Sequence, residues 1–236
     1  LQRYRQIAAD AQTEFTGYDR LEDRGQVLAL LCDGAPVTEA PEGARVELVV
    51  DRTPFYAESG GQLGDIGSIE GPDGTLVIDD TQKPVEGLVV HSGTVSLGRV
   101  CKGDEVRLVV DPEARAASVR NHSGTHLLQW ALRAVLGPQV AQAGSLGAPD
   151  RLRFDFTHDD PLSDDEICKI EDLVNGLILE NVPSRVERKP YRKAIEDGAI
   201  AMFDENTGTR YALSLIHISE PTRRYAIAFC GVWLKK

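Results

Sequence analysis

Short apolar runs separated by turn residues fill the chain between Gly25 and Val110. The runs are rich in Val, Leu and Ile, and pairs such as Asp33-Gly34 and Asp73-Gly74 interrupt them. Several short strands at near-regular spacing, with no helical pattern between them, are typical of a small closed or nearly closed β-barrel. The five runs are QVLALLCDG, ARVELVVD, GSIEGPDGTLVID, GLVVHSGTVS and DEVRLVVD.

A long helix is predicted over residues 112–136. Asp111 can cap its first turn, Pro112 suits the first helical position, and Gly137-Pro138 ends it. Apolar residues recur at helical spacings, which indicates a buried stripe along one face. The stripe consists of Val119, Leu127, Ala131, Ala134 and Val135.

Further helices and strands flank these two regions. Residues 1–15 carry apolar positions at helical spacing, as at the end of a helix, whereas residues 152–158 alternate like a strand. Ser163 and Glu166 form a capping box, which predicts a second long helix that closes near Asn181. Strands packed with helices in this order predict an α+β fold.

His122 and His126 are four residues apart on the predicted long helix. This spacing brings two imidazoles onto one face of one turn, which is half of a metal site. The alternative is a pair of packed, hydrogen-bonded histidines at a helix surface. Position 123 is Ser rather than Glu, so the sequence lacks the His-Glu-x-x-His pattern of zinc proteases.

A glycine-rich loop, FYAESGGQLGDIG, spans residues 55–67. Its glycines permit left-handed backbone angles and a close approach by another chain segment. Both a tight structural turn and a ligand-binding loop fit this pattern. No Gly-Lys-Ser/Thr follows, so the loop is not a phosphate cradle of the P-loop kind.

The net charge of −11 disfavours a protein that grips nucleic acid with its whole surface, but it permits a local basic patch. A candidate patch lies between Pro183 and Lys193, and a solvated strand-and-loop surface explains the same charges. No run of 18 apolar residues and no signal peptide is present, so we expect a cytoplasmic protein without a membrane partner. The basic residues are Arg185, Arg188, Lys189, Arg192 and Lys193.

Five sequence blocks together resemble the alanyl-tRNA synthetase family. They occur in the family's order between residues 51 and 203, and free-standing editing factors of the same lineage share the barrel and histidine motifs. The first residue is Leu1 and the single methionine is Met202, so we expect a piece of a longer protein. The blocks are DRTPFYAESGGQLGDIG, RNHSGTHLLQWALRAVLG, VAQAGS, LRFDF and YRKAIEDGAIAMF.

The resemblance implies a domain organisation. Residues 1–15 would end a preceding helical domain, and residues 16–111 would form a β-barrel of the translation-protein type. Residues 112–212 would form a truncated α+β editing domain. Residues 213–236 no longer resemble the family, and we interpret this tail as an artefact joined to a gene fragment.

The resemblance also implies a function, namely hydrolysis of Ser-tRNA(Ala) and Gly-tRNA(Ala) by a zinc-dependent editing region. The partner would be tRNA(Ala), and neither DNA nor a membrane would take part. His122 and His126 match the family's zinc-binding histidines, Gln142 matches a pocket glutamine, and Thr125 could sense a serine hydroxyl. The Gly60-Gly61-Gln62 segment would lie near that pocket. ATP and Mg²⁺, which the parent ligase needs for alanylation, would bind only in the absent catalytic domain.

The family's later Cys-x-x-x-His motif is missing from this chain, and Cys230 has Leu234 where the histidine would stand. We therefore expect an incomplete zinc site, because zinc sites use three or four protein ligands. Two other functions remain open: a free-standing deacylase and a catalytically silent RNA-binding barrel. Nothing in the spacing recommends another zinc ligand among His91, His158, His217 and Cys168.

Overall fold

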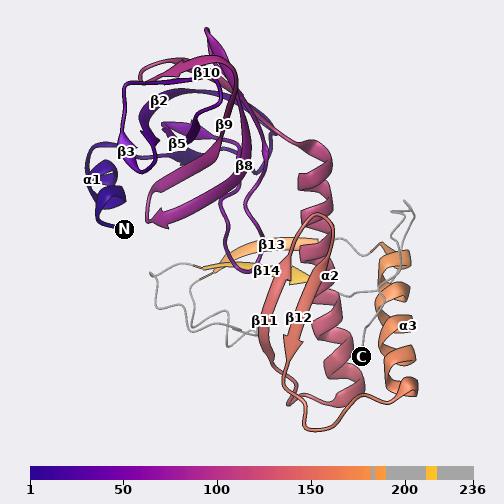
Figure 1. Ribbon diagram of the computed structural model, residues 1–236. Coiled ribbons are helices and arrows are strands. Elements are labelled where there is room, and N and C mark those ends of the chain that lie inside the picture. The colour runs from indigo at the N-terminus through magenta and orange to yellow at the C-terminus, as the bar shows by residue number, and fades with distance from the viewer. Residues whose placement is uncertain (182–183, 190–210, 217–236) are drawn as a thin grey trace. The chain divides into compact units, whose positions relative to one another are not determined.

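The computed structural model describes residues 1–181, 184–189 and 211–216. The chain forms two compact units, one of Leu1–Ser123 with Ser145–Arg153 and one of Gly124–Gly144 with Phe154–Lys236. The elements (Figure 1) are α1 (Gln2–Asp10), β1 (Glu14–Phe15), β2 (Glu22–Cys32), β3 (Ala35–Pro36), β4 (Glu39–Pro41), β5 (Arg45–Val50), β6 (Arg52–Thr53), β7 (Gly67–Glu70), β8 (Gly74–Val85), β9 (Leu88–Cys101), β10 (Glu105–Val110), α2 (Pro112–Leu136), β11 (Gln142–Gly147), β12 (Leu152–Phe156), α3 (Asp164–Glu180), β13 (Ser184–Lys189) and β14 (Tyr211–Ile216).

A closed antiparallel barrel dominates the first unit. Its strands follow the order β10-β7-β8-β9-β5-β2, and β2 pairs back with β10 to close the ring. Figure 1 shows this ring of indigo to magenta strands. The five predicted apolar runs all fall on these strands, so the predicted barrel is confirmed.

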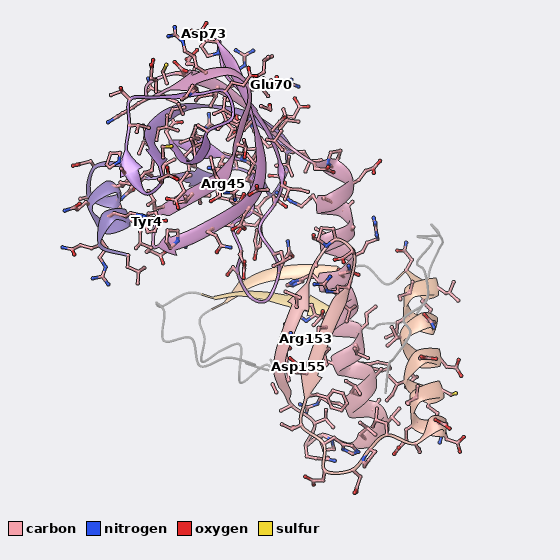
Figure 2. All side chains as sticks on the ribbon, viewed as in Figure 1. Tyr4, Arg45, Glu70, Asp73, Arg153 and Asp155 are labelled. Atoms are coloured by element: carbon pink, nitrogen blue, oxygen red, sulfur yellow. The ribbon has the colours of Figure 1, made fainter. Side chains whose placement is uncertain are left out.

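The barrel interior is aliphatic because the strands alternate inward apolar and outward polar residues. Strand β10, for example, buries Val106, Leu108 and Val110. The outer face carries ion pairs, such as Arg45 with Asp79 at 2.6 Å; Figure 2 labels Arg45 on the barrel. The buried cluster comprises Val27, Leu30, Ala40, Val46, Leu48, Val50, Phe55, Ile69, Leu76, Ile78, Val95, Val100, Val106, Leu108 and Val110.

Helix α1 packs its Tyr4, Ile7 and Ala8 side chains against an apolar cluster of the barrel that includes Val49. The Tyr4 hydroxyl (Figure 2) also donates a hydrogen bond of 3.0 Å to the Glu47 carboxylate. Apolar burial and this hydrogen bond together fix the helix on the barrel wall.

The prediction of a helix over residues 1–15 is wrong in its last part. The helix ends at Asp10, and Glu14–Phe15 form strand β1, which pairs in parallel with β6. The Thr13 and Glu14 N–H groups donate to carbonyls of Gly87 and Asp51. These long-range hydrogen bonds override the local helical spacing.

Helix α2 begins and ends as the sequence predicts. The Asp111 carboxylate accepts 2.9 Å hydrogen bonds from the N–H groups of Glu113 and Ala114, and Gly137 follows with a φ of 113°. Ala131 is buried, as predicted, but Val119 is 49% exposed and Ala134 is exposed, whereas Leu128 and Leu132, outside the predicted stripe, are buried. The real stripe is displaced by about one position around the helix.

In the second unit, α3 carries the predicted capping box, in which Ser163 and Glu166 each satisfy the other's backbone N–H. The helix buries Ile170, Val174 and Leu177, and Asn181 ends it in the left-handed conformation with a φ of 50°. Two-stranded sheets join β11 to β12 and β13 to β14. The fold is thus mixed α+β, as predicted. No helix among the described residues has the length and apolar character needed to cross a membrane.

The expected tail boundary at residue 213 falls inside β14, which pairs antiparallel with β13. Residues 217–236 of that tail lie outside the described part of the chain.

Candidate functional site

The predicted metal-binding histidines lie one turn apart on α2. His122 is partly buried, and burial lowers its pKa below the usual 6.5. Its imidazole is therefore mainly neutral at pH 7, and the neutral form is the one that ligates metals. His126 is also partly buried.

Two imidazoles are fewer ligands than zinc uses in proteins. Across residues 1–181 and the two described strands beyond them, no group of three or more His, Cys, Asp or Glu side chains could hold a metal ion. His158 and Cys168 are exposed, while His217 and Cys230 lie outside the described residues. Among the described residues, the structure therefore offers only the two histidines of α2 as candidate zinc ligands.

His91 has a structural role instead. Its ring is fully buried in the barrel, with Nδ1 at 3.1 Å from the Leu48 carbonyl and Nε2 at 2.7 Å from the Thr53 hydroxyl. Because a carbonyl only accepts, Nδ1 carries the proton and the Thr53 hydroxyl donates to Nε2. Burial lowers the pKa of His91 to about 4. Both ring nitrogens are engaged, so His91 is no zinc ligand in this conformation.

The glycine-rich loop makes a tight turn at its tip. The backbone N–H groups of Ser59 and Gln62 each donate to the carbonyl of the other residue, at 3.2 and 3.0 Å. Gly60 and Gly61 between them have φ values of 58° and 78°, which L-residues rarely adopt. The predicted left-handed glycines are confirmed here.

The same loop lies against the second half of β11. The Gly147 N–H donates to the Gly61 carbonyl at 2.7 Å, and the Leu63 N–H donates to the Gly147 carbonyl at 3.0 Å. A Cβ on Gly61 would stand 2.7 Å from the Ser145 carbonyl oxygen. The glycine content of the loop predicts that another chain segment approaches it closely, and that segment is the second half of β11.

Gly147 also lies beside the histidine helix. A Cβ added to Gly147 would stand 3.8 Å from the His122 backbone nitrogen and 3.9 Å from the Gln62 Cα. Next along the chain, the Ala148 carbonyl accepts a 2.5 Å hydrogen bond from the Asn121 side chain. Within the first unit, the glycine-rich loop, the second half of β11 and the start of the histidine motif thus lie close together.

An ion pair that sequence reasoning missed fixes the base of the loop to α2. Asp65, whose side chain is 3% exposed, accepts hydrogen bonds from Nε and Nη2 of Arg115 and from the Tyr56 N–H. Arg115 also donates to the carbonyls of Gly17 and Pro54, at 3.0 and 2.7 Å. No local pattern reveals this pair, because its partners are 50 residues apart.

The other two predicted site residues belong to the second unit. Thr125 is buried at 8% exposure on α2, and Gln142 is partly buried at the start of β11. Both residues make interactions within the protein. Their predicted contacts with an aminoacyl group stay predictions.

The predicted basic stretch lies mostly on β13, and Arg192 and Lys193 lie outside the described residues. On the barrel, by contrast, several arginines are already paired with carboxylates: Arg45 with Asp79, Arg99 with Asp73, and Arg107 with Glu22 and Glu70.

The sequence of this chain is similar to those of known tRNA synthetases. Residues 2–114 match the family model of class II tRNA synthetases (A). The alanine-tRNA ligase of Chloroflexus aurantiacus is 48% identical over 204 residues, which are 86% of this chain and 23% of that ligase. Alanine-tRNA ligases are therefore homologues of this chain.

Two further alanine-tRNA ligases show the same extent of similarity. The Thermotoga maritima protein is 48% identical over 202 residues, and that of Thermus thermophilus is 49% identical over 196 residues. These matches cover 86% and 83% of the chain, but only 23% and 22% of the ligases. The chain thus spans less than a quarter of the length of these alanine-tRNA ligases. A match over 86% of the chain necessarily includes the segment from His122 to Gln142.

Proposed function

We propose that this chain is the editing portion of an alanine-tRNA ligase and hydrolyses Ser-tRNA(Ala) and Gly-tRNA(Ala) in the cytoplasm. The observation that carries the proposal is the 48% identity to alanine-tRNA ligases over a stretch that includes both histidines of α2. Alanylation of tRNA(Ala) with ATP and Mg²⁺ would belong to the rest of such a ligase.

Physical chemistry explains why such a ligase needs a second site. A pocket that fits alanine rejects glycine only through one missing methyl group, which is worth about 1–3 kcal/mol. Serine adds one hydroxyl, and an apolar pocket excludes it only weakly. A separate hydrolytic site removes the errors that binding alone permits.

His122 and His126 would hold a zinc ion, because burial lowers the pKa of His122 and so favours the neutral imidazole, which is the form that ligates metals. When bound, zinc supplies Lewis-acid polarisation and orientation at the ester. Thr125 and Gln142 would contact the aminoacyl group by hydrogen bonds. With only two histidines, we propose that zinc binds weakly and exchanges with the solution.

The reaction is hydrolysis of an ester. Water adds to the carbonyl carbon of the aminoacyl group, the bond from that carbon to the ribose oxygen breaks, and the ribose oxygen takes up a proton. Free serine or glycine and uncharged tRNA(Ala) leave. Hydrogen-bond donors around the carbonyl oxygen stabilise the charge that develops there.

A silent RNA-binding barrel fits the surface less well, because barrel arginines such as Arg45 and Arg107 are already paired with carboxylates. A free-standing deacylase would use the same chemistry, and the similarity to ligases favours the ligase.

The test is release of labelled serine from Ser-tRNA(Ala) by the full chain with micromolar zinc. We expect release at least tenfold faster than in buffer, loss of that acceleration after dialysis against a chelator, and recovery when zinc returns. His122→Ala should abolish the acceleration, whereas the matched control His158→Ala, an exposed histidine, should retain it. Equal rates for the two variants would contradict the proposal.

A further inference from the structure

Gln129 is a buried polar residue of α2 to which the proposed chemistry assigns no role. It is 5% exposed and stands one helical turn after His126. Residues at this spacing are neighbours on one helix face, with Cβ atoms about 5–6 Å apart, and long helical side chains lean towards the preceding turn. Both residues belong to the second unit. The Gln129 side chain is therefore within reach of the His126 ring.

The two ends of the Gln129 carboxamide differ in what they bind. Its Nε2 donates to the Val140 carbonyl at 3.3 Å, which fixes the amide in the interior. Its Oε1 is buried and has no hydrogen-bond partner among the residues that the structure describes. A buried acceptor without a hydrogen bond lowers the stability of a protein. The described fold thus uses the donor end of this side chain and leaves the acceptor end for another donor.

A histidine that binds a metal requires an acceptor of this kind. One ring nitrogen ligates the metal, while the other carries a proton and donates it in a hydrogen bond, which fixes the tautomer and the orientation of the ring. A carboxamide oxygen accepts such a hydrogen bond as a backbone carbonyl does. The unused oxygen of Gln129 and its position beside His126 both match this requirement.

We propose that Gln129 is a positioning residue for zinc binding, whose Oε1 accepts a hydrogen bond from the ring N–H of His126 that is turned away from the metal. This inference rests on the proposed function, in which His126 is a zinc ligand. The bond to Val140 holds the carboxamide in place, so that its oxygen meets the ring at a fixed point. Because His122 and His126 are the only candidate ligands among the described residues, the orientation of each ring has a large effect on zinc affinity.

The experiment measures the dissociation constant of zinc for the full chain by competition with a chromophoric chelator. We expect Gln129→Met, which keeps the volume but removes the acceptor, to bind zinc about tenfold more weakly. Gln129→Glu removes the donor to Val140 but keeps an acceptor, so it should bind zinc at least as tightly as the wild type. The matched control Gln139→Met removes an exposed amide hydrogen bond to the Leu136 carbonyl and should leave the dissociation constant unchanged.

A spectroscopic signature separates contact with His126 from a general effect on the core. In the zinc-bound wild type, the ring N–H proton of His126 should give an NMR signal that is protected from exchange with water, and Gln129→Met should lose this protection. Equal zinc affinity of Gln129→Met and the wild type would overturn the proposal. Gln129→Glu binding as weakly as Gln129→Met would overturn it too, because that result assigns the loss to the Val140 bond.

Failure of the proposed function can be told apart from failure of this assignment. If zinc affinity depends on Gln129 as expected but the wild type releases no serine from Ser-tRNA(Ala), the hydrolytic function is wrong and the role of Gln129 stands. If the wild type binds no zinc even at millimolar concentration, the zinc site and the role of Gln129 are both wrong.

Discussion

The buried ring of His91 links the barrel core to the root of the glycine-rich loop. Thr53 donates to its Nε2, and the Phe55 N–H in turn donates to the Thr53 hydroxyl at 3.1 Å. These hydrogen bonds require a neutral ring, because a protonated Nε2 no longer accepts. The start of the loop is therefore held by a group that acid can charge.

We predict an acid-dependent loss of stability from His91. Its pKa is about 4 in the fold and near 6.5 in the unfolded chain, so between these values the unfolded state binds more protons. The contribution is fully present above pH 6.5 and is lost as pH falls towards 4, about 3 kcal/mol in all. NMR titration of the ring proton should show no change until pH approaches 4. A transition near 6.5 would contradict this prediction, and His91→Asn should flatten the stability profile across this window.

At the scale of elements, the glycine turn and β11 form a contact that excludes larger side chains. Gly60 and Gly61 provide a matched comparison, because both have positive φ but only Gly61 lies against Ser145. We expect Gly60→Ala to lower the free energy of unfolding by about 1 kcal/mol through backbone strain alone. Gly61→Ala should lower it further, since its Cβ would meet the Ser145 backbone. Urea unfolding of both variants tests this, and equal losses would show that the loop and β11 do not touch in solution.

The ion pair of Asp65 and Arg115 is a second contact that fixes the glycine-rich loop, in this case to α2. Removal of one partner leaves a buried charge uncompensated, so Arg115→Met should destabilise the protein by about 3–5 kcal/mol. Arg45→Met provides the control, because the Arg45–Asp79 pair is half exposed and should leave the urea midpoint nearly unchanged. Similar midpoints for the two variants would refute a structural role for the Arg115 pair.

At the scale of the whole molecule, the parts that sequence predicts are those that local patterns specify. The barrel strands, both caps of α2 and the capping box of α3 depend on residues a few positions apart. The pairing of β1 with β6, the role of His91 and the Arg115 pair depend on contacts between distant segments, which a single sequence does not reveal. In the candidate site, the positive φ angles of Gly60 and Gly61 could be predicted because both residues are glycine. The contact of Gly61 with Ser145 could not be predicted, because it joins distant segments of the chain.

The order in which the barrel closes affects how the protein is made. Strand β10 pairs with both β2 and β7, and it is the last of the six barrel strands in the chain. During synthesis, the edges of β2 and β7 therefore stay open until residues 105–110 have left the ribosome. Open strand edges invite pairing with other nascent chains. The barrel can therefore close only once β10 is available, and the histidine helix α2 follows that last barrel strand directly in the order of synthesis.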